Sequence, residues 1–188
     1  MALSGTKSTF ERLVEPLADR QPFGPNTLTA LGIFLMSLAA YFVVTRIYAL
    51  AVAFVILSGF FDVLDGTLAK MRGRANARGA FFDRIADRIA DALIFGSVII
   101  AGVVQTWLGV AVLALVLLGS YASACLESAT RTRIGETLSM RAVRLIVLAI
   151  GLSTVQFYDV MDYIFAIVGI FALLAFVQRF VLGWKTLK

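Results

Sequence analysis

Five aspartates are concentrated in one polar stretch that lies between apolar segments of the chain. Asp62 and Asp65 are three residues apart, and Asp83, Asp87 and Asp91 follow one another at intervals of four. These spacings place each set of carboxylates along one face of an α-helix, because residues three and four apart are neighbours there. A charge at the centre of a membrane helix costs about 2.5 to 3.5 kcal/mol on insertion scales, so these acids require cations nearby.

The types of residue around the acids favour a metal and phosphate site. Clustered carboxylates without histidine or thiolate neighbours suit hard divalent cations such as Mg2+ or Mn2+. Two such ions would cancel the charge of four acids and make the site attractive to phosphate. Small residues beside the acids would let a flat ligand approach the backbone: Gly66, Ala69, Gly79. The connecting segment adds cations for an anionic ligand: Lys70, Arg72, Arg74, Arg78.

The same stretch resembles the signature of the CDP-alcohol phosphotransferase family. The family pattern is D-x2-D-G-x2-A-R, then eight residues, then G-x3-D-x3-D, and seven of its eight fixed positions are met here. The matching residues are Asp62, Asp65, Gly66, Ala69, Gly79, Asp83, Asp87. Lys70 stands where the family usually has arginine. Lysine keeps the positive charge but loses the planar fork that binds a phosphate through two hydrogen bonds.

The resemblance implies an enzyme of phospholipid synthesis. In such a reaction a hydroxyl of a small polar alcohol attacks the lipid-side phosphorus of a CDP-lipid, either CDP-diacylglycerol or CDP-archaeol, and displaces CMP. The motif positions imply that Asp62, Asp65, Asp83 and Asp87 bind the metal ions and that Asp87 is also the catalytic base. The residues implied to lie around the nucleotide and diphosphate are Asp62, Asp65, Gly66, Ala69, Lys70, Asn76, Gly79, Asp83.

Further residues resemble the branch of the family whose acceptor is an inositol phosphate. Asp91 follows Asp87 by four positions, as an aspartate often does in that branch, and is expected beside the acceptor hydroxyls. Arg141 and Arg144 resemble the basic residues of that branch that bind the acceptor phosphate. Inositol phosphate is therefore the expected acceptor. Glycerol 3-phosphate remains the alternative, and flanking charges of an ordinary membrane helix would also explain the two arginines.

The match to that branch is incomplete after Tyr121. Ser123 and Cys125 stand where the branch usually carries basic residues. Arg131 and Arg133 lie a few residues further along and are candidates to replace them as ligands of the acceptor phosphate.

Composition places the chain in the membrane. Its 188 residues are 60% hydrophobic and only 15% charged, with a mean hydropathy of +0.90, which is too apolar for an ordinary soluble domain. The net charge of +5 does not point to nucleic acid, because the basic residues stand in short segments between apolar ones. The chain has no histidine, which removes the commonest general base and strengthens the case for the aspartates. Cys125 is the only cysteine, so an internal disulfide is excluded.

Six apolar segments predict an all-α membrane bundle of six transmembrane helices. They are about 27–45, 48–69, 80–104, 107–128, 142–158 and 161–183, each near the roughly 20 residues that cross a bilayer. Residues 1–24 are expected to form an amphipathic segment on the membrane surface, preceding a six-helix domain at 25–188. Most Lys and Arg residues stand in the segments that would lie on one side of the membrane, and Arg46 is the one basic residue expected on the other side. The positive-inside rule therefore predicts that both termini and the acidic site are cytoplasmic.

Other interpretations remain open at this stage. Acids within membrane spans also mark ion pathways, so a divalent-cation transporter is the alternative from another class. A scaffold that only binds CDP-lipid is a third interpretation, and pairing of the acids with Arg84, Arg88 and the loop cations to hold helices together is a fourth. Glu127 is expected to pair with a loop arginine. Membership of the family would also imply a homodimer within membrane lipids.

Overall fold

The computed structural model of the chain describes residues 24–71, 77–130, 140–157 and 159–186. Within these ranges the chain forms six α-helices and no strand, which confirms the all-α prediction for the part described. The helices are α2 Pro25–Val44, α3 Tyr48–Met71, α4 Ala77–Ile100, α5 Thr106–Thr130, α6 Met140–Thr154 and α7 Met161–Thr186. The predicted amphipathic helix falls on residues 1–23, outside the described residues.

Local chemistry sets several helix ends. α2 begins with Pro25 in its first turn after the extended Gly24, a position where proline loses no helical hydrogen bond. Arg46 adopts a φ of 62° in the tight turn between α2 and α3, and Gly102 adopts a φ of 68° just after α4. The predicted span 80–104 was therefore too long at its end, because the left-handed glycine stops the helix.

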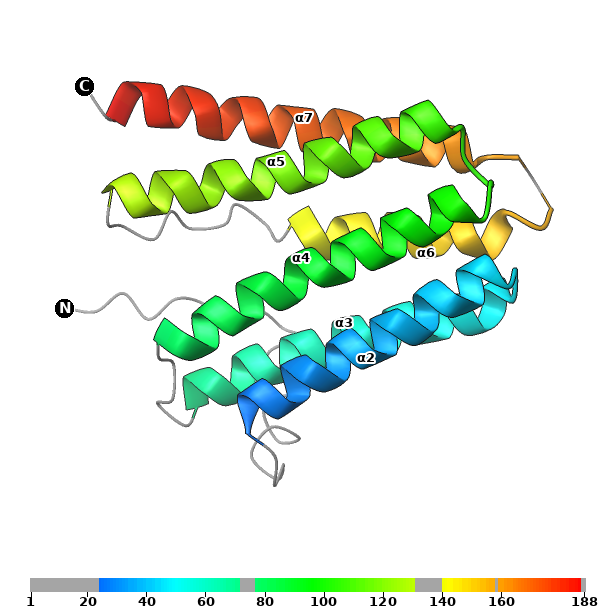
Figure 1. The fold of residues 1–188 in the computed structure, drawn as a ribbon, viewed down its shortest axis with the longest axis horizontal. Helices are drawn as coiled ribbons and strands as arrows, with labels where there is room; N and C mark the ends of the chain where they lie inside the picture. The colour runs from blue at the N-terminus through cyan, green and yellow to red at the C-terminus, as the bar shows by residue number, and fades with distance from the viewer. Residues whose placement is uncertain (1–23, 72–76, 131–139, 158, 187–188) are drawn as a thin grey trace.

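The helices run up and down through one bundle (Figure 1). α2 packs against both α3 and α4, α5 packs against α4 and α7, and α6 packs against α3 and α7. Because each short connection reverses the chain, α2 begins and α7 ends at the same end of the bundle, on the left in Figure 1. The acidic halves of α3 and α4 lie toward this end.

Four of the helices are long and apolar enough to cross a bilayer, namely α2, α3, α5 and α7. α4 has sufficient length but carries six charged residues in its first 15 positions, Arg78, Asp83, Arg84, Asp87, Arg88 and Asp91. α6 has only 15 residues, which at 1.5 Å each span about 22 Å, less than the roughly 30 Å of a hydrocarbon core. The prediction of six equivalent spans is thus met by four of the described helices.

A continuous apolar core joins the helices at the end of the bundle away from the acids. Phe95 of α4 and Phe165 of α7 are fully buried, with ring centroids 5.6 Å apart. Gly109 of α5 permits close contact with α4, since a Cβ at this position would lie 2.5 Å from Ile99 Cγ1. This packing fixes the far ends of α4, α5 and α7 and so leaves the polar ends to form the site.

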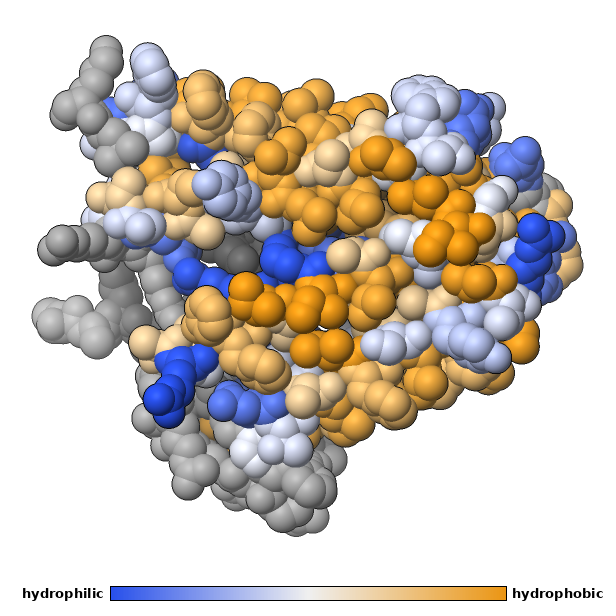
Figure 2. All heavy atoms as spheres, in the orientation of Figure 1, coloured by the Kyte–Doolittle hydropathy of each residue, from blue (hydrophilic) through white to orange (hydrophobic). Residues whose placement is uncertain are grey.

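The outer surface is largely apolar. Large hydrophobic side chains such as Phe34, Ile56 and Phe180 are more than half exposed to the surroundings of the bundle. Figure 2 shows orange apolar residues over much of the middle of one face, with hydrophilic residues toward the two ends and in a hollow beside α4. An apolar surface of this extent suits lipid rather than water, and the chain is a multi-pass membrane protein.

Candidate active site

Three acids from two helices converge near one end of the bundle. One carboxylate oxygen from each of Asp62 on α3, Asp83 on α4 and Asp87 on α4 lies within 4.8 Å of the other two. In the described part of the chain, the backbones of α3 and α4 make no close packing contact, whereas α2 packs against both. α2 thus holds the two acidic helices at a separation that side chains, rather than backbones, bridge.

This group of acids fits a divalent cation. Two oxygens bound to one Mg2+, Mn2+ or Ca2+ ion at about 2.0–2.6 Å are at most about 5 Å apart, which the three carboxylates already satisfy. The donors are all hard carboxylate oxygens, and the sequence has no histidine to compete with them. The three aspartates are half-buried, so a cation would be partly shielded from water.

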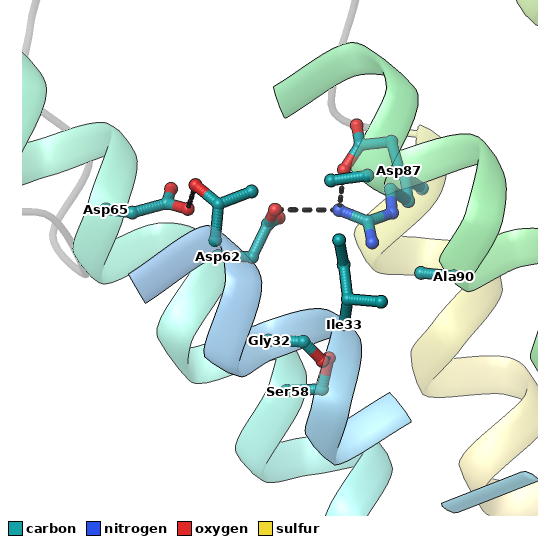
Figure 3. Close-up of a pocket in the computed structure, with 10 residues that line it drawn as sticks. Gly32, Ile33, Ser58, Asp62, Asp65, Asp87 and Ala90 are labelled. Atoms are coloured by element: carbon teal, nitrogen blue, oxygen red, sulfur yellow. Dashed lines mark hydrogen bonds and ion pairs between the residues drawn. The ribbon is translucent and has the colours of Figure 1, made fainter. Parts of the chain in front are cut away.

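Asp65 has a different environment from the other three motif acids. Its side chain is buried, and its Oδ2 accepts a hydrogen bond of 2.5 Å from the hydroxyl of Thr29 on α2. A second polar link between the same helices runs from the Ser58 hydroxyl to the carbonyl of Gly32, at 2.9 Å. These bonds orient the acidic face of α3 relative to α2, and Figure 3 shows Asp65 on the far side of Asp62 from Asp87.

Arg141 of α6 reaches the acids of both helices. Its Nη1 donates to Asp62 Oδ1 at 2.8 Å and forms a close ion pair with Asp87 Oδ1. Its Nε lies 3.7 Å from Asp91 Oδ1, too far for a hydrogen bond. One guanidinium therefore neutralises part of the negative charge contributed by α3 and α4.

Asp91 and Arg144 form the inner part of the same cluster. The side chain of Asp91 is 1% exposed, and its Oδ2 lies 3.3 Å from Arg144 Nη2 and 3.5 Å from Arg88 Nη1. Arg88 also lies 3.5 Å from Asp87 on its own helix. Among the described residues, three buried atoms find no hydrogen-bond partner: Asp91 Oδ1, Arg141 Nε and Arg144 Nε. These polar atoms leave hydrogen-bonding capacity for a ligand beside the acids.

A small pocket connects these groups. Polar and small side chains line it, and α2 and α3 provide its floor opposite α4 and α6 (Figure 3). The lining residues are Thr29, Gly32, Ile33, Ser58, Asp62, Asp65, Ala86, Asp87, Ala90, Arg141. The pocket therefore contains three of the four motif acids and one of the predicted acceptor arginines.

The sequence of residues 23–185 matches the family model for CDP-alcohol phosphatidyltransferase. The chain belongs to this family. The match extends well beyond the acidic signature and includes all six helices described above.

Relatives of this CDP-alcohol phosphatidyltransferase have been assigned to inositol phosphate chemistry. The chain is 29% identical over 192 residues to the archaetidylinositol phosphate synthase of Methanothermobacter thermautotrophicus, covering 99% of this chain and 96% of the relative. Its fold is similar to that of Mycobacterium tuberculosis phosphatidylinositol phosphate synthase with CDP-DAG bound, with a TM-score of 0.78 and 22% identity over 92% of this chain and 94% of that one. The complex of the latter enzyme with manganese and citrate also gives a TM-score of 0.78 and 22% identity, over 91% and 88%.

The structure brings six of the predicted site residues into one cluster, namely Asp62, Asp83, Asp87, Asp91, Arg141 and Arg144, whereas several others are not described. Gly66 is exposed beside the acids of α3, and Gly79 is half-buried in the first turn of α4. The side chains of Ala69 and Lys70 lie outside the described part. Asn76, Arg131 and Arg133, predicted for the nucleotide and the acceptor phosphate, are also outside the described residues.

The prediction for Glu127 was wrong about its partner. Among the described residues Glu127 forms an ion pair with Arg84 of α4 rather than with a loop arginine, because the long side chain of Arg84 reaches from α4 to α5. Arg88 lies close to Asp87 and Asp91 on its own helix and so joins no two helices. Among the described residues, an arginine of this pair thus joins two helices only at Arg84, whose partner is Glu127 and not one of the five aspartates.

Sequence reasoning missed Thr29. It lies in an apolar span, where a hydroxyl residue usually bonds to its own helix backbone, and no local spacing relates it to Asp65, 36 residues away. The available signal was its position one turn after Pro25 and Asn26 in the string PNTLT. Polar residues at membrane-helix interfaces deserve weight because they find partners on neighbouring helices.

We expect Thr29→Val to weaken the α2–α3 contact. The change preserves shape but removes the donor to Asp65, and leaving a buried acceptor without its partner costs about 1–3 kcal/mol. Thermal unfolding of the purified protein should therefore show a lower midpoint for Thr29→Val, with Thr29→Ser close to the unaltered protein. Equal midpoints for all three would show that the hydroxyl does not support Asp65.

Proposed function

We propose that the chain transfers a lipid-linked phosphate from a CDP-lipid to a hydroxyl of an inositol phosphate, with release of CMP. The observation that carries this proposal is the junction of two groups in one site. The acids Asp62, Asp83 and Asp87 adjoin Arg141, which also faces Asp91 and lies on the same helix as Arg144. A metal-binding face for a diphosphate and a cationic face for a second phosphate thus meet at Asp87.

The donor side consists of the motif acids. Asp62, Asp83 and Asp87 would hold a divalent ion between them, and Asp65 would contribute to a second ion with the carboxylate oxygen that Thr29 does not bond. Manganese in the structure of the mycobacterial relative supports Mn2+ or Mg2+. Bound ions would neutralise the diphosphate of the donor and stabilise charge on the departing CMP.

The nucleotide would lie along the open side of α3 beyond the acids. Gly66 is exposed, and a Cβ added there would meet no heavy atom within 4 Å. Glycine is less favourable than alanine inside a helix, and no neighbouring atom requires a residue without a Cβ here. Helix stability and packing therefore do not explain the glycine. Together with Ala69, Lys70, Asn76 and Gly79, it would form the side that accepts cytidine and diphosphate.

The acceptor side consists of α6 and the inner part of α4. Arg141 and Arg144 would bind the phosphate of the acceptor, joined by Arg131 or Arg133. Asp91 is almost fully buried and keeps one oxygen without a hydrogen-bond donor, which suits it to accept from a hydroxyl of the inositol ring. A hydroxyl placed there would lie between Asp91 and the metal-binding acids.

Asp87 is the proposed general base. It lies on α4 one turn before Asp91 and lines the pocket together with Asp62. Asp87 would remove the proton of the attacking hydroxyl while the new phosphorus–oxygen bond forms and the bond to CMP breaks. It belongs to the converging group of acids, pairs with Arg141 and lies on the same helix as Asp91, so it adjoins both faces of the site.

The setting of the reaction is proposed from the charge pattern of the sequence and from the family. We propose that the site and both termini face the cytoplasm, that the protein forms a homodimer among membrane lipids, and that residues 1–24 lie on the membrane surface. Membership of a transferase family argues against the cation transporter that the acids alone left open. The relatives are named for both archaeal and bacterial lipids, so CDP-archaeol and CDP-diacylglycerol are both tested as donors.

The central experiment measures CMP release from the purified protein with Mg2+ or Mn2+, one of the two CDP-lipids, and one of four acceptors. We expect release with inositol phosphate and little with inositol, glycerol 3-phosphate or serine, since the arginine pair recognises a phosphate and Asp91 a ring hydroxyl. Release with glycerol 3-phosphate alone would establish the alternative acceptor. Release with free inositol or serine would contradict the assignment of Arg141 and Arg144 to a phosphate.

The small residue at Gly66 gives a separate test of the nucleotide side. We expect Gly66→Ala to leave thermal stability unchanged or raised, because alanine is favoured over glycine in helices by about 0.8–1.0 kcal/mol. Binding of the CDP-lipid should weaken at least about tenfold, because the added methyl group occupies the approach of the ligand. Gly59→Ala is the matched control, since a Cβ at Gly59 on the same helix also meets no atom within 4 Å. Similar affinities for the two variants would place the nucleotide elsewhere.

A third test concerns the base. Asp87→Asn keeps the size of the side chain but cannot accept the proton, so CMP release should fall by about 100- to 10,000-fold while CDP-lipid binding persists. Asp159→Asn, in the exposed connection between α6 and α7, is the control with the same chemical change far from the site. An Asp87→Asn protein that turns over at the normal rate would remove Asp87 as the base.

A further inference from the structure

Arg141 pairs with two of the three carboxylates that would bind a metal ion. Its Nη1 lies 2.8 Å from Asp62 Oδ1 and is in close contact with Asp87 Oδ1. These two aspartates belong to the group of three whose carboxylates converge within 4.8 Å. The side chain of Arg141 is 13% exposed, so bulk water screens this contact little.

A divalent ion and the guanidinium exclude one another at this position. An ion bound at about 2.0–2.6 Å from oxygens of Asp62 and Asp87 would share these two carboxylates with Arg141 Nη1 and place two positive charges within a few ångströms. Repulsion between them in a partly buried site is strong. Filling of the acidic group by a metal ion therefore requires the guanidinium to withdraw.

The surroundings of Arg141 offer it another arrangement. Its Nε, the Nε of Arg144 and Oδ1 of Asp91 are buried without hydrogen-bond partners in the described part of the chain. Arg144 remains 3.3 Å from Asp91 Oδ2, so the second arginine has a partner that the metal ion does not contest. An anion beside Arg141 and Arg144 would satisfy the two unpartnered nitrogens.

We propose that Arg141 exchanges partners during the catalytic cycle. Divalent metal at Asp62 and Asp87 releases the guanidinium, and the released guanidinium binds the phosphate of the acceptor beside Arg144. The proposal rests on the function given above, because it requires an acceptor that carries a phosphate. Metal binding and acceptor binding then support one another through a single side chain, which makes acceptor binding depend on a loaded donor side.

Such coupling is reciprocal and has a measurable size. If one ligand removes a competitor of a second ligand, it raises the affinity of the protein for the second ligand, typically about 5- to 150-fold. The second ligand then raises the affinity for the first by the same factor. The metal should therefore strengthen acceptor binding, and the acceptor should strengthen metal binding. A site in which Arg141 only supplied fixed positive charge would instead weaken metal binding without any dependence on the acceptor.

Binding of Mn2+ to the full chain in detergent, followed by the electron spin resonance signal of free Mn2+, tests the exchange without turnover. Arg141→Gln removes the competitor and should bind Mn2+ at least about fivefold more tightly than the unaltered protein. Arg144→Gln is the matched control, because it makes the same charge change on the same helix but contacts Asp91 and neither Asp62 nor Asp87. It should tighten Mn2+ binding clearly less. Equal effects of the two variants, or no effect of Arg141→Gln, would overturn the proposal.

A second measurement uses the unaltered protein and guards against a misfolded variant. Calorimetric binding of inositol phosphate should be at least about fivefold tighter with saturating Mn2+ than with chelator, and this difference should disappear in Arg141→Gln. If Arg141→Gln does not fold, Arg141→Met serves, since methionine keeps an unbranched side chain without a charge, and this variant should also bind Mn2+ more tightly. Binding of inositol phosphate that ignores Mn2+ would exclude the exchange.

The exchange and the proposed function can fail separately. One result would retain the exchange and reject the acceptor. In it, Arg141→Gln binds Mn2+ more tightly and the unaltered protein binds inorganic phosphate in the same Mn2+-dependent way, but the unaltered protein releases no CMP with inositol phosphate. CMP release with inositol phosphate, together with unchanged Mn2+ affinity in Arg141→Gln, would retain the function and reject the exchange.

Discussion

Charge neutralisation between α3, α4 and α6 is the constraint on which the site depends. The two acidic helices bring five carboxylates into a bundle with a largely apolar core, and Arg141 is the cation in the described part of the chain that pairs with acids of both helices. Removing one partner of a buried ion pair costs about 3–5 kcal/mol, because the remaining charge is left without compensation. Arg141 and Arg144 stand in the first turns of α6, where the helix dipole disfavours cations, so the acids must hold them there.

The packing around α2 makes this arrangement possible. α2 contacts both acidic helices and fixes α3 through two side-chain hydrogen bonds, from Thr29 to Asp65 and from Ser58 to the Gly32 carbonyl. α3 and α4 thereby stay far enough apart for side chains and ligands to lie between them. The polar half of α4 is then surrounded by protein and by the open end of the bundle, which reconciles its six charges with a membrane setting.

The result is one site with two faces that share a boundary. Asp62, Asp83 and Asp87 offer hard oxygens at metal-binding separations, while Arg141, Arg144 and Asp91 combine buried cations with unused hydrogen-bonding capacity. A reaction that joins a lipid-borne diphosphate to a second phosphorylated molecule needs both faces, since each ligand is anionic and each would otherwise repel the other. The carboxylates of Asp62 and Asp87 belong to both faces and connect them chemically.

Local patterns in the sequence determined a large part of this protein. Hydropathy predicted the membrane class and the six helices to within a few residues at most ends. The fixed spacing of the aspartates pointed to the family. Both signals are local, because helical periodicity relates residues that are only a few positions apart. The predicted ends of two helices were wrong. α4 stops at Ile100, before Gly102 with its positive φ, and α6 stops at Thr154 rather than near residue 158. The interfacial helix, the orientation and the dimer remain predictions.

Only the tertiary structure decided which residues of the signature act together. It separated Asp65, bonded to Thr29, from the converging group of Asp62, Asp83 and Asp87. It also placed Arg141 on Asp62, 79 residues away in the chain, where the sequence had suggested a ligand for the acceptor or an ordinary flanking charge. Contacts of this kind depend on which helices pack together and at what separation, and no spacing within a single helix encodes that information.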